Sequence, residues 1–437
     1  MKKIFSLLII IFLFINSVAQ NWTDVGGGFT VTLGVHCMFS DSFSNKLYVG
    51  GGISKAGSVP LRSIASWDGL NWSAVGSGCI SATDPIWSIT RFRNRIIASG
   101  RLFRVNGNFI GAWNFSTWDS LASGTDSYAD AMISFNDTLY VGGTFTSADT
   151  CKADLFAKWD GSRWYGYDLP FRAGGRAIGT ICSYKNKIYI GGNFYDSVNT
   201  QIHALATIEN GQALMVGPAS TALSGWVEKL IVYKDELYIA GFFNSAFGSN
   251  IIKWDGTSMS AVGSGLGVDW QIMDMTVFND ELYIVGSFEY ADGVYAQYIA
   301  RWDGLSWHAV SNDVFDIPVN CVAVFQNELY IAGGFTDISS QPFHYIAKYT
   351  GPLAVDKISE SGYYSIQPNP CIDKLTISFN NNLPIDYYVY DYIGAGVLKG
   401  HSSAQSLELN VSNLKPGVYF LKVNSEKGNF MDKFIKL

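Results

Sequence analysis

A short apolar pattern that ends in glycine recurs seven times, and it constrains the fold more than any other feature. Its first copy reads Leu47-Tyr48-Val49-Gly50-Gly51. The second residue of the copies falls at positions 48, 97, 140, 189, 238, 283 and 330, so the spacing runs from 43 to 49 residues. A propeller blade of four short strands needs about that length. The repeat therefore predicts an all-β chain built around a seven-bladed β-propeller.

The sixth copy gives the clearest prediction of the strands within one blade. Four strands are expected, at residues 273–278, 281–285, 298–302 and 305–310. Asn279-Asp280 is expected to connect the first two strands. Asp303-Gly304 predicts a type I′ turn between the last two, because such a turn needs positive φ at both of its central residues. A Trp precedes this Asp-Gly pair, as it does at three earlier copies.

The two ends of the repeat region complement each other. The seventh copy stops near residues 349–351 without a fourth strand. The segment Asn21-Trp22-Thr23-Asp24-Val25-Gly26 resembles Asn71-Trp72-Ser73-Ala74-Val75-Gly76, which lies at a fourth-strand position. A spare strand at the start and a missing one at the end predict a propeller closed by the N-terminal strand. Closure of this kind protects strand edges that would otherwise aggregate.

These residues resemble the kelch type of propeller repeat. The resemblance rests on Gly50-Gly51, then the aromatic-Asp pair Trp67-Asp68, then Trp72, with the same order in the third copy. It covers residues 20–351 and implies the fold. It does not imply a function, because propellers of this type carry unrelated activities.

The first nineteen residues have the features of a signal peptide. Lys2 and Lys3 precede an apolar run at residues 4–15, and small residues follow. We expect cleavage between Ala19 and Gln20. The apolar run is too short to cross a bilayer as a helix, and no later segment has the character of a membrane span. The mature chain is therefore expected to have no transmembrane segment.

After a linker at residues 352–363, the segment 364–437 is expected to form a small antiparallel β-sandwich. This segment resembles the type A C-terminal sorting domain of the type IX secretion system of Bacteroidetes. The resemblance is carried by Pro368, Asn369, Pro370, Gly394, Gly417, Tyr419, Lys433 and Lys436, whereas Gln367 and Ala395 depart from the pattern. It implies that the secretion machinery is a partner, and that the protein passes through the periplasm to be secreted or attached to the outer-membrane surface.

Composition excludes some classes of partner and chemistry. Charged residues make up only 15% of the chain and the net charge is −7, without a basic stripe, which argues against a nucleic-acid ligand. The five histidines show no metal-ligand spacing, and no nucleophile elbow or calcium loop occurs. We therefore assign no catalytic residue, no metal and no cofactor, and expect a monomer. If a disulfide forms, Cys79 and Cys151 are the best candidates, whereas Cys182 and Cys321 fit buried strands.

The long, irregular loops on one side of the predicted propeller are the expected ligand-binding face. They carry unrepeated aromatic and acidic residues suited to a glycan or protein ligand: Trp87, Tyr195, Trp226, Trp270, Tyr290, Tyr295, Phe343 and Asp292. The preferred function is a non-catalytic binding module. The alternative is a secreted carbohydrate-active enzyme, either a lyase or a copper radical oxidase. An oxidase of that type would need two histidines near the axis, and only His36 is so placed.

Overall fold

The structure is a computed structural model that describes residues 21–79, 84–100, 109–169, 171–196, 203–217, 223–267, 270–351, 364–379, 384–391, 396–425 and 428–437. The expected cleavage site at Ala19 and Gln20, and Gly394 of the sorting pattern, lie outside these residues. The chain divides into two compact units, Met1–Gly351 and Pro352–Leu437. The described residues of both units form strands and no helix, so they include no helix that could span a membrane.

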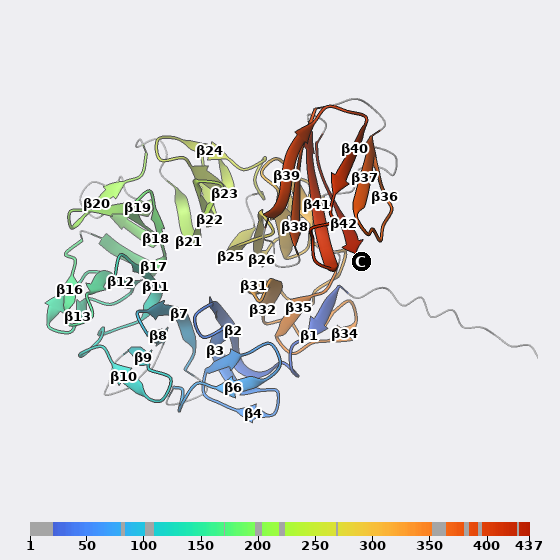
Figure 1. Ribbon diagram of the computed structural model, residues 1–437. Coiled ribbons are helices and arrows are strands. Elements are labelled where there is room, and N and C mark those ends of the chain that lie inside the picture. The colour runs from blue at the N-terminus through green and yellow to red at the C-terminus, as the bar shows by residue number, and fades with distance from the viewer. Residues whose placement is uncertain are drawn as a thin grey trace, which may run out of the picture. The chain divides into compact units, whose positions relative to one another are not determined.

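In the N-terminal unit the described residues form seven antiparallel sheets with a main path of four strands each, besides short two-stranded hairpins (Figure 1). The sheets are numbered by the order of their innermost strands. Sheet 1 consists of β2 (Phe29–Asp41), β3 (Lys46–Ala56), β5 (Ile64–Trp67) and β6 (Trp72–Ala74), with β4 (Val59–Pro60) beside β3. Sheet 2 consists of β7 (Ile86–Phe92), β8 (Arg95–Gly100), β9 (Ile110–Trp113) and β10 (Trp118–Ser120). Sheet 3 consists of β11 (Ala129–Phe135), β12 (Thr138–Gly143), β15 (Phe156–Trp159) and β16 (Trp164–Gly166). Sheet 4 consists of β17 (Phe171–Tyr184), β18 (Lys187–Asp196), β19 (His203–Glu209) and β20 (Gln212–Met215).

The remaining sheets follow the same order. Sheet 5 consists of β21 (Ser224–Tyr233), β22 (Glu236–Ser245), β23 (Gly248–Trp254) and β24 (Met259–Ala261). Sheet 6 consists of β25 (Gln271–Phe278), β26 (Glu281–Ser287), β29 (Ile299–Trp302) and β30 (Trp307–Ala309). Sheet 7 consists of β31 (Val319–Phe325), β32 (Glu328–Gly333), β35 (Ile346–Tyr349) and β1 (Trp22–Asp24). Three short hairpins lie between second and third strands: β13 (Ser147–Ala148) with β14 (Cys151–Lys152), β27 (Tyr290–Ala291) with β28 (Val294–Tyr295), and β33 (Asp337–Ile338) with β34 (Gln341–Pro342).

The innermost strands follow one another around a central channel, and the last of them, β31, lies beside the first, β2. Strand β1 completes the last sheet by pairing with β35, with Trp22 opposite Tyr349. A side chain from sheet 7 also reaches sheet 1, where the Gln326 amide donates to the Asp68 carbonyl at 3.2 Å. The N-terminal unit is therefore all-β and propeller-like, as the repeat predicts.

The turn prediction for the sixth copy is half right. Asn279 and Asp280 both have positive φ and join β25 to β26 as a two-residue turn. The Asp303-Gly304 turn is not of type I′. Trp302 pairs with Trp307, which leaves a four-residue loop in which only Gly304 has positive φ. The Asp303 carboxylate accepts the backbone N–H groups of the two residues after the glycine, at 2.7 and 2.8 Å, so the side chain rather than a tight turn shapes this loop.

The described residues of the C-terminal unit form two antiparallel sheets that share one hydrophobic core. The first consists of β36 (Tyr364–Gln367), β37 (Lys374–Phe379) and β40 (Ser406–Asn410). The second consists of β39 (Gly396–Ser402), β38 (Ile385–Asp391), β41 (Gly417–Ser425) and β42 (Gly428–Lys436). Leu375 and Ile377 of the first sheet pack with Val389, Leu421 and Phe434 of the second.

Candidate functional site

Each innermost strand of the N-terminal unit carries a β-bulge at the same place. At this place the strand contains one more residue than its partner, and the extra residue lies opposite the glycine that ends the repeated pattern. The bulged residues, one from each sheet in order, are His36, Trp87, Asp130, Gly179, Glu228, Met273 and Asn320. All seven line the central channel.

The repeated glycine explains the bulge. A Cβ added at Gly143 would lie 2.8 Å from the Cα of Ala129 and even closer to the Tyr128 carbonyl oxygen, and real Cβ atoms do not approach other atoms this closely. A Cβ at Gly286 would meet the Gln271 carbonyl in the same way. The missing side chain therefore leaves room for the extra backbone of the bulge, which aims a neighbouring side chain away from the sheet.

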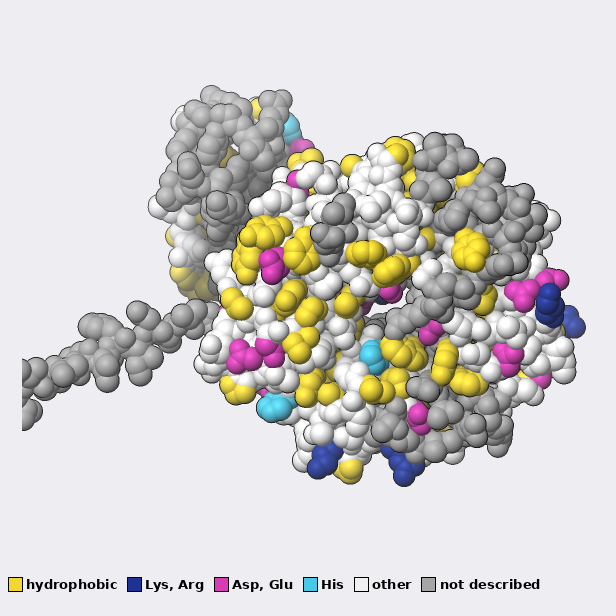
Figure 2. Space-filling model, turned by 180° about the vertical axis from the view of Figure 1, so that it is seen from behind, with side chains coloured by type: hydrophobic (Ala, Val, Ile, Leu, Met, Phe, Trp, Pro, Cys, Tyr) yellow, Lys and Arg dark blue, Asp and Glu magenta, His cyan; other side chains and the backbone are white. Residues whose placement is uncertain are grey.

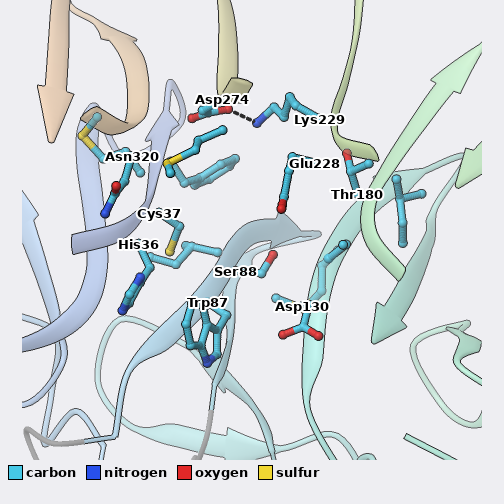
Figure 3. Close-up of a pocket in the computed structure, with 18 of the residues that line it drawn as sticks. His36, Cys37, Trp87, Ser88, Asp130, Thr180, Glu228, Lys229, Asp274 and Asn320 are labelled. Atoms are coloured by element: carbon cyan, nitrogen blue, oxygen red, sulfur yellow. Dashed lines mark ion pairs between the residues drawn. The ribbon is translucent and has the colours of Figure 1, made fainter. Parts of the chain in front are cut away.

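The channel is a cavity of about 550 Å³ lined by residues of all seven innermost strands. From behind, hydrophobic side chains gather around a central hollow whose edge also shows acidic side chains (Figure 2). In the close-up the Glu228 carboxylate points into the cavity, while Trp87 and His36 lie together on the side opposite Lys229 (Figure 3). The rings of Trp87 and His36 are 4.1 Å apart between centroids and tilted by 32°. The lining thus combines aromatic faces with carboxylate, amide and hydroxyl groups.

An ion pair holds two of the innermost strands together inside the channel. The Lys229 ammonium lies 2.6 Å from the Asp274 carboxylate, which also accepts the N–H groups of Met275 and Val322 (Figure 3). Burial alone would lower the pKa of Lys229, but the Asp274 carboxylate outweighs this effect and raises that pKa above its ordinary value. Lys229 is therefore a fixed cation at neutral pH.

Two further polar contacts position bulged residues. The Gln271 amide donates to the Glu228 carboxylate at 3.0 Å, and the Asn320 amide donates to the Val35 carbonyl at 3.1 Å. Both contacts join one sheet to the next. They orient side chains that the bulges push into the channel, and so give the lining a defined geometry.

The thiols near the channel are protonated at neutral pH. Burial and the nearby Asp274 carboxylate raise the pKa of Cys37 and of Cys321, and burial raises that of Cys182 to about 11. All six cysteines are free. Cys79 and Cys151, the best candidates for a disulfide in the sequence, are therefore not bonded to each other. Cys151 belongs to the β13–β14 hairpin of sheet 3, whereas Cys79 is buried after the last strand of sheet 1.

Of the aromatic residues expected to bind a ligand, Trp87 is the one that lines the channel. Trp226, two residues before the bulged Glu228, is half-buried and packs on Phe242 with ring centroids 4.7 Å apart. Trp270 is half-buried against the core between sheets 5 and 6. These two tryptophans therefore flank the start of innermost strands without lining the cavity.

The other expected residues lie between second and third strands, at the exposed end of a second strand, or in the core. Tyr290 and Tyr295 face each other across the β27–β28 hairpin, with 45% and 47% of their surface exposed. Asp292 is in the turn of that hairpin, where its carboxylate accepts the Ser264 hydroxyl. Tyr195 is exposed on β18. Phe343 is 3% exposed and packs in the core of sheets 6 and 7, so its ring is not available to a ligand.

Sequence reasoning missed six of the seven bulged residues as candidates, although a signal for them exists. From sheet 2 to sheet 7, each bulged residue lies thirteen positions before the final glycine of its repeat, as Trp87 does before Gly100 and Asp130 before Gly143. In sheet 1 a longer turn between β2 and β3 widens this spacing. Among the described residues no group of His, Cys, Asp and Glu has the arrangement of a metal site.

In the C-terminal unit the residues of the sorting pattern connect its beginning to its end. The Asn369 side chain accepts the Ile435 N–H at 3.0 Å, and Cys371, just after Pro370, exchanges backbone hydrogen bonds with Ile435 and Leu437. Tyr419 packs on Phe434 with centroids 5.5 Å apart. Lys436 is 7% exposed. Gly417 and Lys433 lie on the paired strands β41 and β42, and Pro368 directly follows β36.

Residues 365–437 match the model of the family described as "Secretion system C-terminal sorting domain". This part of the chain is a type IX secretion sorting domain, and it indicates export to the cell surface or into the medium. No curated protein matches the chain.

Solved structures that match this chain have little sequence in common with it. One is PorZ, a surface component of the type-IX secretion system of Porphyromonas gingivalis, at 12% identity and a TM-score of 0.36, covering 92% of this chain and 65% of PorZ. The chain thus spans less than two thirds of PorZ. Another is the propeller domain of the Trilobed protease from Pyrococcus furiosus, at 9% identity and a TM-score of 0.38, covering 74% and 95% of the two chains. The designed protein Ika8 has 13% identity and a TM-score of 0.42, with 74% and 98% covered. The sorting domain and the sheets arranged around the channel make this chain an exported all-β protein with a propeller-like unit.

Proposed function

We propose that the propeller-like unit is an exported, non-catalytic binding module that takes its ligand at the mouth of the central channel. The observation that carries this proposal is the ring of seven bulged residues. The backbone arrangement repeats from sheet to sheet, yet six of the bulges present different side chains to the same cavity, and the bulge of sheet 4 presents Gly179. A rigid frame with variable side chains is suited to recognition.

The chemistry of the lining favours a glycan, or a polar loop of a protein, as the ligand. The Trp87 ring offers an aromatic face, and Asp130 and Glu228 offer carboxylates that accept hydrogen bonds from hydroxyl groups. In sheets 2, 3, 6 and 7 the bulges lie where the second strands end, so the loops after those strands lie at the same mouth. The Tyr290–Tyr295 hairpin is one of these loops, and Trp226 and Trp270 precede two of the bulges.

The finer architecture belongs to the same proposal. The seven sheets would be the blades of a kelch-like propeller at residues 20–351, closed by β1 after removal of a signal peptide at residues 1–19. A linker at 352–363 would lead to a β-sandwich at 364–437 that the secretion machinery recognises. The pairing of β1 with β35 and the shared core of the two C-terminal sheets support this reading. The exported protein would act as a monomer.

Binding of the purified chain to a broad glycan panel, with reaction products monitored in parallel, tests the proposal. We expect saturable binding without product. Trp87→Ala should weaken it at least tenfold, and Glu228→Gln should weaken it without unfolding the protein. Phe115→Ala is the matched control for an exposed aromatic residue away from the channel, because Phe115 lies in the loop between the outer strands β9 and β10, and it should have little effect.

Other outcomes would change the proposed site or the proposed function. Loss of binding on Tyr290→Ala with Trp87→Ala unaffected would move the site from the channel to the loop hairpin. Turnover of a glycan would replace the binding module with a secreted carbohydrate-active enzyme. Copper that co-purifies in stoichiometric amount would point to the oxidase form of that alternative.

A further inference from the structure

A pair of large side chains fills the space between neighbouring sheets at six of the seven boundaries. One member ends the third strand and the other begins the fourth, directly opposite it. In sheets 1, 2, 3, 5, 6 and 7 these pairs are Trp67 with Trp72, Trp113 with Trp118, Trp159 with Trp164, Trp254 with Met259, Trp302 with Trp307, and Tyr349 with Trp22. Each pair packs against the preceding sheet.

Sheet 4 lacks this pair. The corresponding residues are Ile208 and Ala213, which lie opposite each other across β19 and β20. They face sheet 3 and pack in the core between sheets 3 and 4. Two small side chains therefore stand where the other sheets place at least one indole or phenol ring.

The consequence is visible on the facing side of sheet 3. At most boundaries the tyrosine in the second position of the repeat is covered by the next sheet, and Tyr48, Tyr238, Tyr283 and Tyr330 are only 1–2% exposed. Tyr140 occupies the same position in sheet 3, yet it is half-buried. The covering side chains are smaller here, so the phenol ring remains accessible.

A cavity of about 550 Å³ lies at this boundary. Sheet 3 contributes Tyr140, Lys158 and Tyr165, which are neighbours in one row across its strands. Tyr167 adds a third phenol, and Ile188 and Ile208 of sheet 4 form part of the opposite wall. Burial raises the pKa of Tyr140, and raises that of Tyr167 to about 12 with the help of Tyr140, so both phenols are neutral. The Lys158 ammonium lies 5.3 Å from the centre of the Tyr165 ring.

We propose that this cavity is a second binding site, which takes an indole-sized aromatic ring where the other sheets place their own. The neighbouring boundary shows how such a ring would be held. Between sheets 4 and 5, the Trp254 indole N–H donates to the hydroxyl of Tyr189 at 3.3 Å, and Tyr189 occupies the same repeat position as Tyr140. A bound indole would donate to Tyr140 in the same manner and would pack between the phenols and the two isoleucines.

The site shares no lining residue with the central channel, so its occupancy is independent of the proposed function there. The indole ring could come from a free aromatic metabolite or from a tryptophan side chain of a partner protein. Both sources have the same ring chemistry. They differ in what is attached to the ring, which a comparison of probes can separate.

Titration of 5-fluoroindole with the full chain, followed by fluorine NMR, tests the proposal. We expect saturable binding to the native chain. Ile208→Trp restores the side chain found in the other sheets, so it should fill the cavity, raise the thermal midpoint and weaken binding at least tenfold. Tyr140→Phe keeps the ring but removes the hydrogen-bond acceptor, and should weaken binding several-fold. Glu228→Gln in the channel is the control and should leave the affinity unchanged.

Competition identifies the source of the ring. Displacement by N-acetyl-tryptophanamide supports a protein side chain as the natural occupant. Displacement by indole but not by N-acetyl-tryptophanamide supports a free aromatic molecule. The proposal is overturned if the native chain shows no saturable binding, or if Ile208→Trp binds the probe as well as the native chain. Displacement by monosaccharides at similar concentration would also overturn it, because the cavity would then not select an aromatic ring.

Discussion

The repeated glycine allows a quantitative test of the bulge ring. In Gly143→Ala the new Cβ would meet only backbone atoms, the Tyr128 carbonyl and the Cα of Ala129 at 2.8 Å. Backbone cannot rotate away as a side chain can. The strands β11 and β12 must move apart, which threatens the hydrogen bond from Thr144 N–H to the same Tyr128 carbonyl, now 2.9 Å long.

The expected loss of stability follows from three effects. Overpacking of this kind costs about 1–3 kcal/mol, and loss of one backbone hydrogen bond adds about 1 kcal/mol. Alanine also lowers the conformational entropy of the unfolded chain, which stabilises the folded state by about 0.4–1 kcal/mol. We therefore expect Gly143→Ala to lower the free energy of unfolding by about 1–3.5 kcal/mol.

Sheet 7 offers a matched control. A Cβ at Gly333 would lie 3.0 Å from the Pro318 carbonyl and 3.3 Å from the Cα of Val319, distances that a shift of a few tenths of an ångström relieves. Gly333→Ala should therefore cost less than about 1 kcal/mol. Urea unfolding followed by tryptophan fluorescence measures both variants. Equal losses, or a neutral Gly143→Ala, would refute the view that the glycine exists to admit the bulge.

Three further predictions concern other contacts within the N-terminal unit. Trp164→Phe removes the hydrogen bond from its indole N–H to the Leu121 carbonyl at 2.7 Å, and that carbonyl keeps the Gly124 N–H at 3.0 Å, so urea unfolding should show a loss of about 0.5–1.5 kcal/mol from this bond. An unchanged midpoint would mean that water replaces the indole. Because the folded pKa of Lys229 is raised, its ion pair stabilises the folded chain fully below the unfolded pKa of about 10.4, and this stabilisation is lost as pH rises through the folded pKa. Above a pH of about 10.4 the thermal midpoint should therefore fall more steeply with pH for the native chain than for Lys229→Met, and parallel profiles would contradict this. Deletion of residues 21–25 leaves the edge of β35 unpaired, so light scattering should show concentration-dependent association, whereas a monodisperse deletion variant would show that β1 is dispensable.

The repeat and the pairing of the ends were readable in the sequence because they depend on local patterns. The two-residue turn at Asn279-Asp280 and the extra strand at Trp22 are examples, and the structure has both. The Asp303 loop was misread because the pair Asp-Gly fits two loop lengths, and the side chain of Asp303 decides between them by accepting two backbone N–H groups.

The candidate site was less accessible to sequence reasoning. A bulge arises from the pairing of two strands, and the period of a single strand does not reveal which residue is extra. Asp130 and Glu228 therefore look like ordinary strand residues in the sequence. Phe343 failed in the opposite way, because a loop residue with an apolar ring can as easily turn into the core as out of it. In the C-terminal unit, β39 has mostly exposed side chains and gave no apolar pattern to detect.

The pairing of β1 with β35 has a consequence for quality control during export. Trp22 and Tyr349 are more than 300 residues apart, so closing that loop costs about 5 kcal/mol of chain entropy until the sheets between them have stacked. Sheet 7 can be completed only after residue 349 has been synthesised. The sorting domain follows directly, at residues 365–437. A chain that ends before residue 349 lacks both its last sheet and the sorting domain, so the sorting domain is present only on chains synthesised through all seven sheets.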